Sequence, residues 1–139
     1  MAIFLNNKVG FKVATVDLSD HVTAFSLNRQ ADQVEVTAMG DTAHKFVTGL
    51  SADTITVTFL NDTAAGSVLA TLQAAYGTTV AFTAIQDKDA AVGATNVLYT
   101  GTILVDNLTD INGAVADEAM FDITFTCNST TAVATTGTF

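Results

Sequence analysis

The chain has 139 residues, of which 49% are hydrophobic and only 14% are charged, and its formal net charge is −9. This length suggests one domain with a sizeable core, and the acidity argues against a surface that binds nucleic-acid phosphates, which requires clustered cations. The single cysteine, Cys127, excludes an internal disulfide and a cysteine-based zinc site.

The N-terminus, MAIFLNNKVGFK, lacks a basic segment before an apolar run, so we expect no signal peptide. No apolar stretch reaches the length of a membrane span, and we expect a soluble protein made in a reducing compartment. The low charge and the mean hydropathy of +0.41 favour coverage of part of the apolar surface by other subunits. The alternative is that threonine and small polar residues supply the surface.

The N-terminal third is predicted to be β-structure followed by a long loop. Apolar residues alternate over 9–16, which predicts a strand, and weaker strands are predicted at 22–28 and 33–37. Residues 38–52 show no apolar periodicity and are predicted to form a loop. Loops of this length in a compact domain are usually functional or mobile.

The middle of the chain is predicted to contain a strand and one helix. In TITVTF (54–59) apolar residues alternate with threonine, which is typical of a half-buried antiparallel strand. Residues 61–77 have helical spacing instead, which predicts a helix over about 64–76 with Gly77 just beyond its end. Asp62 or Ser67 is the candidate N-cap of this helix. Its apolar side is formed by Val68, Leu69, Leu72 and Tyr76.

Three further strands are predicted after residue 78, at 79–85, 96–106 and 119–127, from period-two alternation. Gly101 is predicted to mark a bulge or a close backbone approach. The Thr-rich tail from about residue 129 is predicted to be flexible or docked on a partner. The fold class is therefore mainly β, a β-sandwich or half-barrel of about seven antiparallel strands with one flanking helix, in a single domain spanning 1–139.

No catalytic or metal-binding motif is present, so we expect neither an enzyme nor a cofactor. GDTAHK lacks the glycine before Lys45 and the Ser/Thr after it that a phosphate-binding loop requires. His21 and His44 are the only histidines, and neither has a second histidine at metal-ligand spacing. Residues 106–118 fail as a calcium loop because apolar residues stand at the first and twelfth ligand positions. This segment is predicted to be a polar loop between two strands.

From about residue 20 to 130 the chain carries a series of short motifs in a fixed order. The first is a group of residues that ADTITVTF follows: Val34, Val36, Thr37, Gly40, Asp41, Phe46, Gly49 and Leu50. After them come the helix LATLQAAYG, the strand TTVAFTAI and the closing strand FDITFTC. In this order the motifs resemble those of the tail tube (major tail) proteins of long-tailed bacteriophages.

The resemblance implies a structural virion protein whose subunits form hexameric rings, with sheets joined into an inner β-barrel. Stacked rings form the tail tube, assembled in the bacterial host cytoplasm, through which the genome travels without specific binding. The implied partners are other copies of the chain and other tail proteins, with no membrane. Related tubes occur in contractile tails and in the type VI secretion apparatus.

The loop over 38–52 is then the predicted inter-subunit contact. The alternative is that Phe46 and Leu50 fold back onto their own core. The predicted apolar anchors of this contact are Met39, Phe46, Val47 and Leu50. Its polar side chains, which are predicted to fix the alignment of the two subunits, are Asp41, His44 and Lys45.

Glu35 and Asp122 are the candidates for the channel wall, because each alternates with residues assigned to the core and must therefore face away from it. The outer wall of the tube is the alternative location. We expect most of the five cations at subunit contacts with aspartates. A capsid decoration protein, another structural virion protein, a type VI tube subunit, or a ligand-binding sandwich or small enzyme remain the rival interpretations.

Overall fold

The computed structural model describes residues 7–139, which form ten strands, one α-helix and a short 3-10 helix. The prediction of a mainly β, antiparallel fold with one helix is confirmed. The helices are α1 (Val68–Ala75) and η1 (Ser19–His21). The strands are β1 (Gly10–Val13), β2 (Val16–Asp17), β3 (Val22–Asn28), β4 (Ala31–Glu35), β5 (Phe46–Ser51), β6 (Thr54–Leu60), β7 (Thr79–Ile85), β8 (Leu98–Leu104), β9 (Met120–Cys127) and β10 (Ala132–Ala134).

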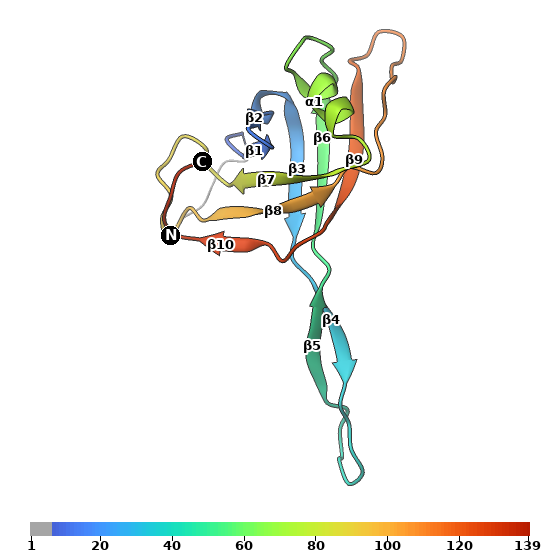
Figure 1. Cartoon of the computed structure of the whole chain (residues 1–139), viewed down its shortest axis with the longest axis vertical. Coiled ribbons are helices and arrows are strands. Elements are labelled where there is room, and N and C mark those ends of the chain that lie inside the picture. Colours follow the sequence, from blue (N-terminus) through green and yellow to red (C-terminus); the bar gives the residue numbers. More distant parts are fainter. Residues whose placement is uncertain (1–6) are drawn as a thin grey trace.

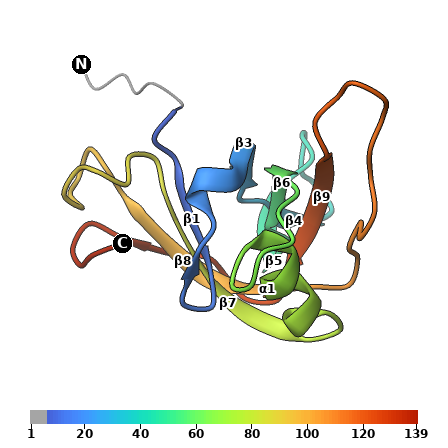
Figure 2. The same cartoon turned by 90° about the horizontal axis from the view of Figure 1, so that it is seen from above.

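Eight strands form one sheet in the order β2-β1-β7-β8-β9-β6-β3, with β10 paired to β8 outside this path. The sheet bends where β8 meets β9, because these strands share only the pairs Ile103 with Cys127 and Leu104 with Thr126. Strands β3, β6 and β9 run along the long axis, whereas β7, β8 and β10 run across it (Figure 1, Figure 2). The folded sheet is an open half-barrel with the core between its two parts.

The core forms where the apolar sides of the two parts of the sheet face each other. Along β9 every second residue is buried, and the same alternation on β6 matches it across the pair. Burial of these side chains is the main stabilising term of the fold. The largest fully buried side chains are Phe11, Phe59, Phe82, Phe125, Leu18, Ile55, Leu72, Ile85, Ile103, Val13, Val57 and Val68.

The helix is shorter than predicted. It begins at Val68 because the residues before it turn: the Asp62 carboxylate accepts the Ala64 N–H at 2.9 Å. The Ser67 side chain makes no capping hydrogen bond. Gly77 has φ of +79°, the left-handed conformation expected after a helix end, so this prediction is confirmed.

Gly101 permits a close approach and not a bulge, because β7 and β8 pair without a register shift across it. A Cβ on Gly101 would lie 3.0 Å from the Phe82 ring and 3.2 Å from Ser129 Oγ. The predicted strand over 9–16 is instead a hairpin of β1 and β2. The chain reverses at Ala14, where φ is +56°.

The C-terminal segment packs on its own sheet, which differs from the predicted flexible or partner-docked tail. β10 pairs with β8, and Thr131 just before it is buried. The Phe139 ring lies over β1, with its centre 4.3 Å from Lys12 Nζ. This contact is a cation–π arrangement that holds the end of the chain against the body.

Candidate functional site

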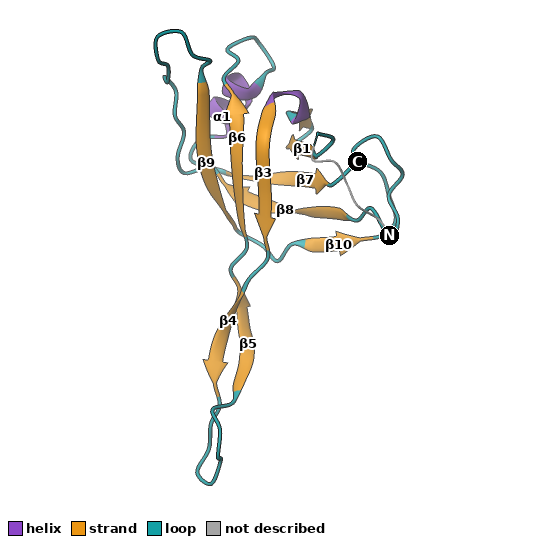
Figure 3. Cartoon of the chain, turned by 180° about the vertical axis from the view of Figure 1, so that it is seen from behind, coloured by secondary structure: helices purple, strands orange, loops and turns teal. Residues whose placement is uncertain are grey.

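The most prominent feature outside the core is a hairpin formed by β4, β5 and the turn between them, residues 31–51, here called the arm. The arm projects from the body along the long axis (Figure 1, Figure 3). Ala31 pairs with Ser51, and Glu35 pairs with Phe46. The predicted loop over 38–52 is therefore wrong for 46–51, which form β5 of this hairpin.

The tip of the arm is shaped by its own hydrogen bonds. Lys45 Nζ donates to Asp41 Oδ1 at 2.7 Å, and the Ala38 N–H donates to Asp41 Oδ2 at 2.8 Å. These two donors, Lys45 first, hold the pKa of Asp41 below its ordinary value. The Lys45 N–H donates to Thr37 Oγ1 at 2.9 Å and closes the turn. Asp41 and Lys45 thus position each other within one subunit.

The base of the arm is fixed to the body through Asp53, which is 3% exposed. Its carboxylate accepts the Gln30 N–H and the Thr131 N–H, each at 3.0 Å. Burial alone would raise the pKa of Asp53, but hydrogen bonds from Thr131 and Gln30 outweigh it and hold the pKa below its ordinary value. One carboxylate therefore joins the start of the arm to the segment that leads into β10.

The arm has two faces because side chains alternate along each strand. One, here called the valine face, carries Asp32, Val34, Val36 and Val47; a Cβ built on Gly49 would lie close to Val34 and Asp32. Its valines are about half exposed, and Asp32 is exposed. The opposite face carries Glu35 and Phe46, which pair with each other, whereas Leu50 lies where the register shifts between Ala31 and Gln33. Leu50 is 80% exposed, and Met39 at the tip is fully exposed.

Both faces of the arm are thus open to solvent. This exposure tests two interpretations of the sequence, one for Phe46 and Leu50 and one for Glu35. Phe46 and Leu50 do not fold back onto the core of their own subunit. The reason given for Glu35 is also wrong, because its neighbours on β4 are exposed and not part of the core. The Glu35 carboxylate instead accepts a hydrogen bond from His44 Nδ1 at 2.6 Å. The exposed Val34 and Val36 were missed as arm residues because V-x-V alternation is also typical of a half-buried strand.

Asp122 has the environment that its alternation predicts. It is exposed on β9 between the buried Phe121 and Ile123, and it accepts a hydrogen bond from Thr58 on β6. Asp122 therefore faces away from the core. Its location on a channel wall stays a prediction.

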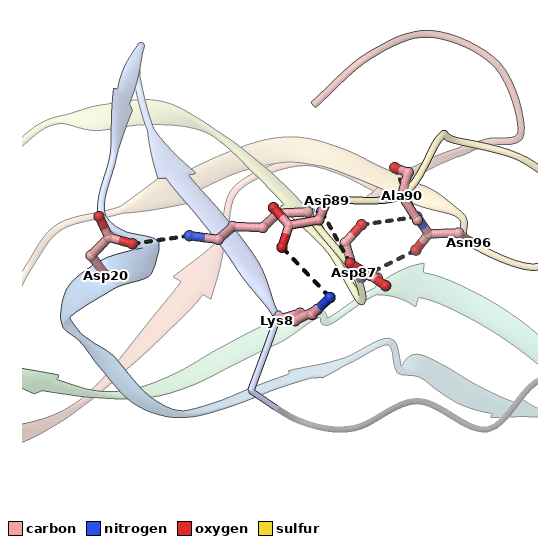
Figure 4. Close-up of polar contacts among 7 residues, drawn as sticks. Lys8, Asp20, Asp87, Asp89, Ala90 and Asn96 are labelled. Atoms are coloured by element: carbon pink, nitrogen blue, oxygen red, sulfur yellow. Dashed lines mark hydrogen bonds and ion pairs between the residues drawn. The ribbon is translucent and has the colours of Figure 1, made fainter.

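Three of the five cations pair with aspartates of the same subunit. Lys45 pairs with Asp41 on the arm. On the body, Lys8 Nζ lies 3.8 Å from Asp89 and Lys88 Nζ lies 2.9 Å from Asp20 (Figure 4). Over residues 7–139, Lys12 and Arg29 form no ion pair within 4 Å, and Lys12 instead contacts the Phe139 ring.

Within residues 7–139 no group of three or more His, Cys, Asp or Glu side chains is placed to hold a metal ion. His21 Nε2 lies 2.9 Å from Asp62 Oδ2, so that histidine has a structural partner. No helix in the described part of the chain is long and apolar enough to cross a membrane. Comparison with protein-family models and with curated proteins found no match to this chain.

Proposed function

We propose that this protein is a structural subunit that self-assembles into stacked rings, forming a tube of the bacteriophage tail type through which a genome is delivered. It would be assembled in the host cytoplasm and end in the virion tail, with ring contacts to copies of itself and further contacts to other tail proteins. The resemblance of its motif order to tail tube proteins suggests hexameric rings.

The observation that carries this proposal is the arm. Its exposed apolar side chains form the largest group of exposed large hydrophobics in residues 7–139, and they are Val34, Val36, Met39, Phe46, Val47 and Leu50. Apolar side chains gathered on a projection are a feature of protein interfaces. Because the tip and base are held by hydrogen bonds, the arm presents these side chains with little entropy left to lose on binding.

A second observation supports a conduit. On the outer side of β3, β6 and β9, three rows of small residues, all but one of them polar, line up across the strands. The face has no lysine or arginine and one carboxylate, so it would line a channel without attracting a sliding polyanion. Its nine residues are Ala24, Ser26, Asn28, Thr54, Thr56, Thr58, Asp122, Thr124 and Thr126.

Sedimentation and negative-stain electron microscopy over a range of concentrations and salt test the proposal. We expect rings or tubes of the wild-type chain. Leu50→Ser on the arm should raise the concentration for half-assembly about tenfold or more. Ile111→Ser is the matched control, because Ile111 is at least as exposed as Leu50 but lies in the β8–β9 loop. A species that stays monomeric, or forms only trimers, under all conditions would overturn the tube and favour another structural role.

A further inference from the structure

A groove on the body has the chemistry to receive the arm. It lies beside β3, whose far edge has no strand partner within residues 7–139, because β3 pairs only with β6. Its volume is about 540 Å³, in the usual range of about 300–1,000 Å³ for binding clefts. The side chains that matter here are Phe25, Leu27, Arg29, Ile85, Val97 and Tyr99.

The far wall of the groove is the β7–β8 connection, which is braced by polar contacts (Figure 4). The Asn96 side chain donates to the Asp87 carbonyl at 2.9 Å, and its oxygen accepts the Asp87 N–H at 3.2 Å. Lys88 on the same connection pairs with Asp20. The groove is therefore preformed, which lowers the entropic cost of filling it.

The groove differs in charge from the rest of the molecule, which is acidic. Arg29 is the only charged residue that lines it, and over residues 7–139 no carboxylate lies within 4 Å of Arg29, although its charge helps to lower the pKa of Asp53 at the base of the arm. The arm has the opposite balance, with three carboxylates against one lysine. Its valine face combines apolar side chains with Asp32, which matches a groove of apolar side chains and one arginine.

The arm cannot fill the groove of its own subunit. It points away from the body (Figure 1), and its base is fixed by the hydrogen bonds to Asp53. At about 3.3 Å per residue, the ten residues from Ala31 to the tip reach about 30 Å outwards. The nearest surface that this arm can enter with its base intact belongs to another molecule.

We propose that the groove beside β3 receives the arm of a second copy of this chain, with the valine face packed against Phe25 and Leu27 and Asp32 paired with Arg29. This inference rests on the proposed self-assembly and names its contact. Because arm and groove are different surfaces, the contact is head-to-tail, and repetition gives a closed ring or an open filament.

Thiol cross-linking between variants that each carry one introduced cysteine tests the contact. Val47→Cys on the arm and Thr95→Cys at the groove are mixed in equal amounts and treated with a short bismaleimide. Both positions are exposed. The wild-type chain, treated in the same way, measures the background cross-linking through the buried Cys127. Thr124→Cys on the outer face of β9 replaces Thr95→Cys as the control. We expect a covalent heterodimer with Thr95→Cys and none above background with Thr124→Cys.

Charge reversal tests the proposed ion pair. Asp32→Arg and Arg29→Asp should each raise the concentration for half-assembly about tenfold or more, and the double variant should recover most of that loss. Glu118→Arg in the β8–β9 loop makes the same change in net charge as Asp32→Arg and should assemble as the wild type does.

The outcomes distinguish this contact from the proposed function. Rings or tubes that form without the Val47–Thr95 cross-link, or that tolerate both charge reversals, overturn the contact and leave self-assembly standing. A chain that never assembles overturns both. A small molecule that co-purifies in native mass spectrometry and is lost in Arg29→Asp would also contradict the proposed occupant.

Discussion

Replacing Asp53 with alanine should destabilise the protein by removing the acceptor shared by two segments. The wild-type carboxylate accepts the Gln30 N–H at the base of the arm and the Thr131 N–H before β10. Alanine leaves both donors without this acceptor. The Thr131 N–H is buried and has no access to solvent there, whereas the Gln30 N–H is only partly buried and can regain a bond to water.

The magnitude follows from this difference. A buried donor left unsatisfied costs about 1–3 kcal/mol, and hydrogen bonds to charged groups lie at the upper end. Counting Thr131 in full and Gln30 in part, we expect Asp53→Ala to lower the free energy of unfolding by about 2–4 kcal/mol. Asp53→Asn keeps one acceptor oxygen and should lose about half as much.

Urea denaturation at several pH values measures this loss. The pKa of Asp53 is lowered in the folded state, so its stabilising contribution is complete above the ordinary value of 3.8 and is lost as pH falls through the lower folded pKa. The difference between wild type and Asp53→Ala should therefore be constant from pH 7 to about pH 5 and shrink below about pH 4.

The exposed Asp122→Ala is the control, and it should change stability by less than about 0.5 kcal/mol. An Asp53→Ala variant as stable as this control at pH 7 would refute the assignment of Asp53 as the link between the arm and the β10 segment. A difference that stays constant down to pH 2 would refute the role of its charge.

Three other results are expected. Leu72→Ala removes a fully buried helix side chain and should cost about 2–5 kcal/mol by thermal or urea unfolding, whereas Tyr76→Ala, at an exposed position, should cost under about 1 kcal/mol; equal losses would contradict the packing of α1. Val34→Ser should leave unfolding unchanged within about 0.5 kcal/mol yet weaken assembly; a large drop in stability would place Val34 in the core. Burial raises the pKa of the Cys127 thiol, so it should resist thiol reagents until the protein unfolds; rapid labelling of the native protein would contradict this.

The strands that could be predicted are those with one face on the core. On β6 and β9 the buried Val57 and Ile123 alternate with exposed threonines, so burial and sequence share one period. β5 could not be recognised, because both of its faces are exposed and nothing forces apolar and polar residues to alternate. β10 is three small residues long and is defined by its pairing with β8, a contact distant in sequence.

The sequence predicts which segment of the chain forms the candidate site, but not the structure of that segment. The sequence predicts Met39, Phe46 and Leu50 as contact residues, and they lie exposed on the arm, whereas the contact itself stays a prediction. The fixed shape of the arm was missed because it depends on Asp53 and Thr131, which are far apart in the chain. The groove was missed for the same reason, since β3 and the β7–β8 connection meet only in the folded chain.

The separation of the arm from the core has a consequence for how this sequence can change over evolutionary time. A substitution at a core position such as Phe59 is selected first for its effect on folding stability, whichever partner the protein contacts. A substitution at the exposed Val47 or Leu50 has almost no effect on folding stability, so selection acts on it only through its effect on binding by the arm. Under the proposed contact, arm and groove can therefore change during evolution as long as they change together, and related chains would then form assemblies that exclude each other while keeping the same body.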